Sequence, residues 1–81
     1  MSRSFKITFD YIDDYFLKEL ERTYVFYNDY IELEYKKQNK WEIIKEIKSF
    51  DELMTKIRDK NIQSGHVIFY SIIRNPSVRM G

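Results

Sequence analysis

The last predicted strand decides the fold, and its sequence reads HVIFYSIIR over residues 66–74. Because side chains alternate along a strand, this stretch is apolar on both faces, with Val67, Phe69 and Ile73 on one and Ile68, Tyr70 and Ile72 on the other. A sheet covered by helices on one face is expected to carry polar residues on its other face. The second face is therefore covered either from within, by another strand order or a folded-back tail, or by a partner protein or a second copy.

A helix is predicted just before this strand. Residues 49–52 read SFDE, which is a capping box: the serine caps the helix and the glutamate follows three residues later. The apolar stripe that follows consists of Phe50, Leu53, Met54 and Ile57. Basic residues end the segment, where cations are favoured by the helix dipole. We expect a helix over residues 50–60.

Two alternating segments at residues 30–37 and 41–47 predict a β-hairpin. A two-residue loop would put the apolar sets of the two strands on opposite faces. A three-residue loop instead pairs Lys37 with Trp41, Tyr35 with Ile43 and Ile31 with Ile47, so that the apolar sets share a face. We therefore expect the three-residue loop.

The N-terminal part predicts a strand followed by a helix. Residues 4–10 alternate, with Phe5, Ile7 and Phe9 on one face. Asp10 is expected to cap an amphipathic helix over residues 11–23. Residues 24–27, Tyr-Val-Phe-Tyr, fit either a short extra strand or the last turn of that helix, and their β-branched and aromatic content favours the strand.

The order βαββαβ predicts the α+β class and a ferredoxin-like sandwich, an antiparallel sheet with two helices on one face. In that arrangement the last strand lies at a sheet edge. We expect a single domain over residues 1–76, with or without the extra short strand at 24–27, and a loose tail over residues 77–81.

Composition excludes several kinds of chemistry. The chain has 81 residues, no cysteine and one histidine, His66, so disulfides, thiolate catalysis and cysteine zinc sites are excluded. No glycine-rich phosphate loop or calcium-loop spacing occurs, and we expect no enzyme activity, no cofactor and no metal. Residues 1–20 contain three aspartates, so we expect no targeting segment there. The apolar runs are too short for a membrane span. A cytoplasmic location is expected.

The amino-acid usage and the charge distribution point to a binding role. The chain has no alanine, which is typical of AT-rich genomes such as those of low-GC bacteria and their phages or of AT-rich archaea and their viruses. We expect a phage, virus or mobile element as the source, with the host cytoplasm as location. Residues 10–34 carry eight acidic and two basic side chains and five tyrosines, a residue suited to protein interfaces. We expect a small regulator or inhibitor that binds a larger protein and forms a homodimer. The candidate self-contact is Ile68, Tyr70 and Ile72, and the candidate exposed helix face is Asp13, Asp14, Lys18 and Glu21.

A basic hairpin tip supports an alternative function, the binding of single-stranded nucleic acid. The candidate phosphate contacts are Lys36, Lys37, Lys40 and Arg74, with Trp41 beside them as a stacking residue. Against this alternative, the first strand places Lys6 and Thr8 outward where an RNA-binding sheet of the RRM type has aromatic residues.

Overall fold

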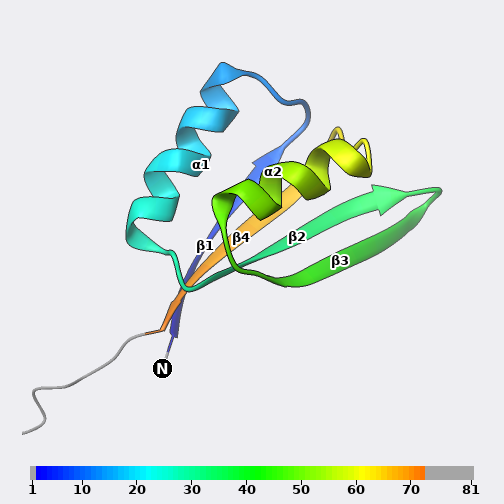
Figure 1. Cartoon of the computed structure of the whole chain (residues 1–81). Helices are drawn as coiled ribbons and strands as arrows, with labels where there is room; N and C mark the ends of the chain where they lie inside the picture. The colour runs from blue at the N-terminus through cyan, green and yellow to red at the C-terminus, as the bar shows by residue number, and fades with distance from the viewer. Residues whose placement is uncertain (1, 73–81) are drawn as a thin grey trace, which may run out of the picture.

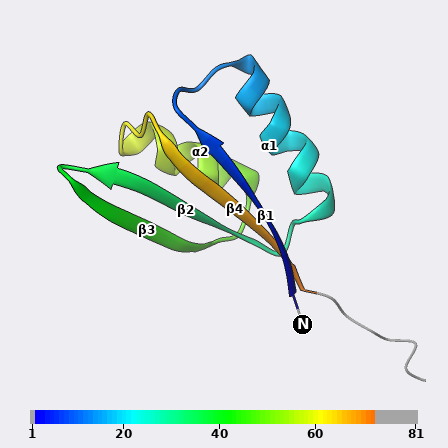
Figure 2. The ribbon, with the colours of Figure 1, turned by 180° about the vertical axis from the view of Figure 1, so that it is seen from behind.

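The computed structural model describes residues 2–72 and contains six elements in the order βαββαβ. The strands are β1 (Ser2–Phe9), β2 (Tyr30–Lys37), β3 (Lys40–Ile47) and β4 (Gly65–Ile72), and the helices are α1 (Asp14–Phe26) and α2 (Phe50–Asp59). Both helices lie over one side of a twisted sheet, and the view from behind shows the strands uncovered (Figures 1 and 2). The predicted α+β class with an antiparallel sheet is confirmed.

The strand order differs from the ferredoxin-like prediction. The order is β1-β4-β2-β3, so β4 lies between β1 and β2 rather than at an edge. All three pairings are antiparallel. Each helix therefore connects two parallel strands that are separated by a third. A central position explains the apolar character of β4, because both of its neighbours contribute side chains that cover it. The end of the predicted strand, Ile73 and Arg74, and the tail at 77–81 lie outside the described residues.

The core fills the space between the sheet and the helices. Its buried members are Phe9, Phe16, Leu20, Ile31, Leu33, Tyr35, Ile47, Leu53, Ile57, Ile62, Val67 and Phe69. Those from one strand are spaced two residues apart, as a single sheet face requires. Gly65 at the start of β4 has a φ of +156°, and a Cβ there would lie 2.1 Å from the carbonyl oxygen of Glu34. A glycine is therefore needed where β4 meets β2.

Helix α2 begins as predicted, whereas α1 is displaced along the chain. The hydroxyl of Ser49 accepts a hydrogen bond from the Glu52 amide at 3.0 Å, which confirms the predicted cap. In α1 the cap is Asp13, which accepts from the Phe16 amide at 2.8 Å, so the prediction of Asp10 as the cap is wrong. The two aspartates are chemically equivalent caps, and the contacts of Phe16 in the core select the later one.

Residues 24–27 form no strand; α1 runs on through Phe26. Tyr24 contacts two core rings, with centroids 6.0 Å from Phe50 and 6.4 Å from Phe69. A helix turns Tyr24 and Tyr27 toward the same side as Leu20, which a strand could not do. These tertiary contacts outweigh the preference of aromatic and β-branched residues for extended chain.

The hairpin loop has two residues, so the predicted three-residue loop is wrong. Gln38 and Asn39 both have positive φ, 51° and 68°, and Lys37 lies opposite Lys40. A bulge farther along β3, where Glu46 has a φ of 59°, shifts the register so that Ile31 still lies opposite Ile47. The extra residue in β3 therefore allows a two-residue turn while Ile47, at the end of β3, still faces the core. It leaves Trp41 and Ile43 on the face away from the helices.

Candidate interaction surfaces

The uncovered face of the sheet carries the predicted self-contact residues of β4. Ile68 is only 8% exposed, because its direct neighbours on the two adjacent strands are Lys6 and Glu32. The aliphatic parts of such side chains can cover an apolar neighbour while their charged groups stay in water. Ile72 is 43% exposed. On this face, Ile68 is therefore covered within one chain, Tyr70 is half-buried and Ile72 is exposed.

Aromatic pairs join the strands on the same face. Tyr70 stacks on Tyr30 with ring centroids 4.5 Å apart and donates a hydrogen bond to Glu32 at 3.1 Å. Burial is the main cause that raises the pKa of Tyr70, and the hydrogen bond to Glu32 and its charge add to the effect. The rings present their faces to one another, so they do not form an open stacking platform.

His66 lies at the other end of this face and is engaged by its neighbours. Its Nδ1 is 2.9 Å from the hydroxyl oxygen of Thr8, and its ring stacks on Trp41 with centroids 5.3 Å apart. In the described residues no group of three or more histidine, cysteine, aspartate or glutamate side chains is placed to hold a metal ion.

The lysines of the alternative prediction lie at the hairpin tip. Lys36, Lys37 and Lys40 are exposed, and Trp41 beside them is 56% exposed. The tip projects beyond the helices in Figure 1. On the uncovered face, Lys36 is followed along β2 by Glu34 and Glu32, so the positive charge of this strand is confined to the tip. Arg74 lies outside the described residues.

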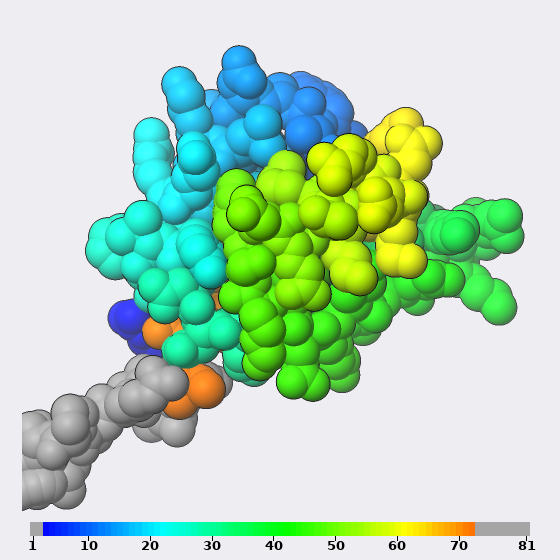
Figure 3. All heavy atoms as spheres, viewed as in Figure 1, coloured from blue at the N-terminus to red at the C-terminus, as the bar shows by residue number. Residues whose placement is uncertain are grey.

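The predicted exposed face of α1 borders a hollow between the two helices. Asp14, Lys18 and Glu21 line a cavity of about 350 Å³ together with Leu17, Phe50 and Met54. Asp13 is engaged as the helix cap and is exposed. Figure 3 looks onto this side of the molecule, where α1 and α2 lie next to each other.

A second, larger cavity adjoins the first and shares Met54 with it. It has a volume of about 550 Å³, and its apolar lining is Tyr11, Ile12, Met54, Ile57 and Ile62. Asp10 and Arg58 also border it. We call the two together the inter-helix groove. The sequence indicated the α1 side of it through the acidic, tyrosine-rich segment, but the α2 side chains read only as core residues.

Two further findings concern the helices and the comparison with known proteins. No helix within residues 2–72 is long and apolar enough to cross a membrane. Comparisons with protein-family models, with curated proteins and with solved structures found no match.

Proposed function

We propose that the protein is a small, non-enzymatic protein-binding module that regulates or inhibits a larger protein. In this proposal the inter-helix groove holds an apolar segment of the partner that also carries basic residues. The observation that carries it is a pair of largely apolar cavities that share Met54 and are bordered by three acidic and two basic side chains, Asp10, Asp14, Glu21, Lys18 and Arg58. The proposal includes an origin in a phage, virus or mobile element, on the basis of the amino-acid usage, and action in the cytoplasm.

The dimensions and lining of the groove support binding of side chains from a partner. The two cavities, of about 550 and 350 Å³, have the size of ordinary ligand sites. Tyr11 is 69% and Ile12 38% exposed in the free chain, so large apolar groups are available at the surface. Covering them would contribute roughly 25 cal/mol per Å² of apolar surface removed from water.

The charges at the border of the groove favour a partner segment that carries basic residues. Asp10, Asp14 and Glu21 border the groove, while Lys18 and Arg58 are the basic residues there. The surrounding segment 10–34 has a net charge of −6. Basic residues flanking the apolar segment of a partner would therefore be attracted to the border, which speeds association and favours this orientation.

A direct test uses two short amphipathic peptides as probes, one of leucine and lysine and one of leucine and glutamate. The isotope-labelled full chain is titrated with each, and amide chemical shifts are followed. We expect the leucine–lysine peptide to shift the amides of Leu17, Lys18 and Met54, and the leucine–glutamate peptide to leave them in place. Shifts confined to other surfaces, or equal binding of both peptides, would overturn the proposal.

Matched variants sharpen this test. Glu21→Lys reverses a charge at the groove, and Glu46→Lys reverses an exposed charge on β3 that does not line it. We expect Glu21→Lys to weaken binding of the leucine–lysine peptide about three- to tenfold, as expected for one exposed charge contact and its reversal, and Glu46→Lys to leave binding nearly unchanged.

Binding of single-stranded nucleic acid remains the second candidate, because an exposed Trp41 stands beside three exposed lysines at the hairpin tip. A deoxythymidine oligonucleotide tests it in the same titration. Binding that shifts the amides of Lys36, Lys37 and Lys40 and weakens steeply with salt would support this candidate. The absence of binding at low salt would exclude it.

A further inference from the structure

Strand β1 is an edge of the sheet, and nothing in its backbone protects it from pairing. It runs for eight residues, its only hydrogen-bonded neighbour within residues 2–72 is β4, and no residue in it has a positive φ. Phe5 in its middle is 46% exposed although it belongs to the apolar side of the strand. An edge of this kind presents a row of free backbone donors and acceptors that another strand can join.

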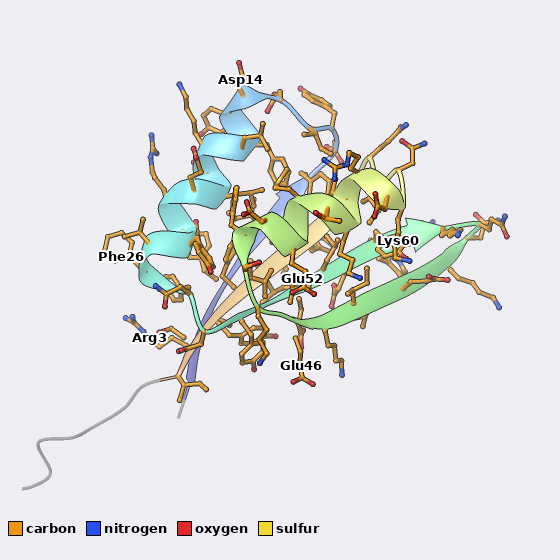
Figure 4. The ribbon with its side chains drawn as sticks, in the orientation of Figure 1. Arg3, Asp14, Phe26, Glu46, Glu52 and Lys60 are labelled. Atoms are coloured by element: carbon orange, nitrogen blue, oxygen red, sulfur yellow. The ribbon has the colours of Figure 1, made fainter. Side chains whose placement is uncertain are left out.

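Helix α1 presents a stripe of side chains on the same side of the molecule. The residues Tyr15, Glu19, Arg22 and Phe26 recur at the spacing of one helix face. Tyr15 and Glu19 line a hollow of about 210 Å³ together with Ile7, Thr8 and Phe9 of β1, so the stripe adjoins the free edge. Figure 4 shows Phe26 on the side of α1 that faces away from α2.

This stripe exposes large aromatic groups and unpaired charges. Tyr15 is 74% and Phe26 69% exposed. Among the residues that the structure describes, neither Glu19 nor Arg22 forms an ion pair within the chain. Aromatic and arginine side chains of this kind are the usual strong contributors to protein interfaces.

The spacing of the stripe makes it complementary to itself. Tyr15 and Phe26 lie equally far from the centre of the stripe, and so do Glu19 and Arg22. If two such helices lie antiparallel about a two-fold axis, each Tyr15 faces the partner's Phe26 and each Glu19 faces the partner's Arg22. We propose that two copies of this chain form a dimer in this way, with their β1 edges joined into one continuous sheet.

The strand fits the same axis. The ring of Phe9 stacks on Phe16 at 4.4 Å, and that of Phe5 lies 5.9 Å from Tyr27, so the middle of α1 lies above Ile7. Antiparallel pairing centred on Ile7 places Phe5 opposite the partner's Phe9. It also places Lys6 opposite the partner's Thr8 rather than opposite a second lysine, so the pairing contains no like-charge contact.

Such a dimer closes after two copies and leaves other surfaces free. An isologous contact uses the same patch on both chains, so no β1 edge remains for a third copy. The smaller cavity of the inter-helix groove lies on the opposite side of α1 and is not covered, whereas Asp10 and Tyr11 line both the larger cavity and the hollow beside β1. The dimer therefore does not depend on the proposed function, and either can fail alone. It also differs from the self-contact predicted through Ile68, Tyr70 and Ile72, which lies on the uncovered face of the sheet.

Sedimentation equilibrium of the full chain over a wide range of concentrations tests the proposal. We expect a reversible dimer that Phe26→Glu weakens at least about 30-fold, the effect of losing an interface residue of the strongest class. Val25→Glu is the matched control, because Val25 is 67% exposed on the adjacent position of α1 but lies outside the stripe. Circular dichroism verifies that each variant remains folded. A strict monomer would overturn the proposal, and so would a dimer that resists Phe26→Glu but is lost with Ile72→Glu.

A charge exchange tests the pairing itself. In Glu19→Arg each new arginine faces the partner's Arg22, and in Arg22→Glu each new glutamate faces the partner's Glu19. Each variant alone is therefore expected to dimerise about tenfold more weakly. Mixing the two variants restores an opposite charge at every contact. We expect the mixture to form dimers as tightly as the original chain. A mixture that dimerises no better than its components would contradict the antiparallel pairing.

Discussion

The two edges of the sheet differ in how far they are closed to further pairing. Strand β3 carries a bulge, with Glu46 in a left-handed conformation, and is rich in charged residues, Lys40, Glu42, Lys45 and Glu46. Strand β1 is regular, and only Arg3 and Lys6 are charged. Bulges and charges are the usual means by which proteins block edge strands. The comparison teaches that the sequence protects one edge within the chain and leaves the other available for association.

The bulge that protects β3 also decides which side chains this strand exposes. Before the bulge, toward the hairpin tip, Lys36 lies opposite Trp41 and Glu34 opposite Ile43, on the uncovered face. After it, Ile47 is fully buried opposite Ile31. One left-handed residue, Glu46, therefore separates the largely exposed part of β3 from its buried last residue, Ile47. The β1–β4 pair has no such shift along its length.

The largest effect is expected where β4 holds the two halves of the sheet together. Gly65 lies opposite Phe9 of β1 and Tyr35 of β2. We expect Gly65→Ala to lower the free energy of unfolding by about 3 kcal/mol or more, because the added carbon collides with backbone that cannot move freely. Urea unfolding measures the loss, and Ser64→Ala, at an exposed neighbouring position, is the control. A loss below about 1 kcal/mol would show that β2 and β4 can separate locally without cost.

The next effect concerns the hydrogen bond that ties β3 to β2. The hydroxyl of buried Tyr35 donates to Glu42 at 3.0 Å, and we expect Tyr35→Phe to destabilise by about 1.5 kcal/mol. The matched change on the β4 side, Tyr70→Phe, removes a similar bond to Glu32 from a half-buried position and is expected to cost less. Urea unfolding of both variants gives the two losses in free energy of unfolding. Equal losses would mean that the greater burial of Tyr35 does not strengthen its hydrogen bond.

The same tyrosine predicts a loss of stability in alkali. Burial, followed by the hydrogen bond to Glu42 and its charge, raises the pKa of Tyr35 above its ordinary value of 10.0. The unfolded chain therefore releases this proton more readily than the folded one. The stability that the protonated Tyr35 hydroxyl contributes is complete below pH 10.0, and it is lost as the pH rises through the raised pKa of the folded chain. When urea unfolding is measured from neutral pH into alkali, the free energy of unfolding should decline less steeply for Tyr35→Phe than for the original chain. Parallel declines in the two proteins would contradict this prediction.

A smaller effect, of opposite sign, is expected at the bulge. Glycine adopts the left-handed conformation of Glu46 without the penalty of about 1 kcal/mol that other residues carry. We therefore expect Glu46→Gly to raise the free energy of unfolding by up to about 1 kcal/mol. Lys45→Gly, one residue earlier and not left-handed, should lower it instead. Thermal or urea unfolding distinguishes the two. Destabilisation by Glu46→Gly would mean that the side chain matters more than the backbone.

The smallest effect is expected at the hairpin turn. Both central residues have positive φ, which is the geometry of a type I′ turn, and asparagine followed by glycine is the pair best suited to it. We expect Asn39→Gly to stabilise by about 0.5 kcal/mol, because glycine is the better residue at the second position. Replacement of Asn39 by valine should destabilise. If the two variants had the same free energy of unfolding, the turn conformation would not affect the stability of the protein.

Prediction from the sequence succeeded where local signals and burial agreed. The capping box at Ser49 fixed the start of α2, and alternation identified β2 with its buried Ile31, Leu33 and Tyr35. It failed where two structures shared one local pattern. The hairpin register is one example, because a two-residue turn with a bulge and a three-residue loop both bring Ile31 opposite Ile47.

The candidate surfaces remain predictions, but the placement of their residues can be compared with the structure. The acidic face of α1 with Asp14, Lys18 and Glu21 was found from the sequence, and the structure places these residues along the inter-helix groove. Met54 was recognised only as part of an apolar stripe, although it links both cavities. The stripe of Tyr15 and Phe26 was missed, because periodicity shows that a helix is amphipathic but not which neighbour each flank meets.

The sequence by itself determined the order of the six main elements, the chemical kind of the helix caps and the α+β fold class, because these depend on contacts between residues close in the chain. It also determined that β4 is apolar on both faces. Only the tertiary structure decided that β4 is central, that α1 continues to Phe26 and that Glu46 begins a register shift. These choices depend on contacts between distant segments, such as Tyr24 with Phe69 and Gly65 with Glu34, whose energies exceed the local preferences that the sequence expresses.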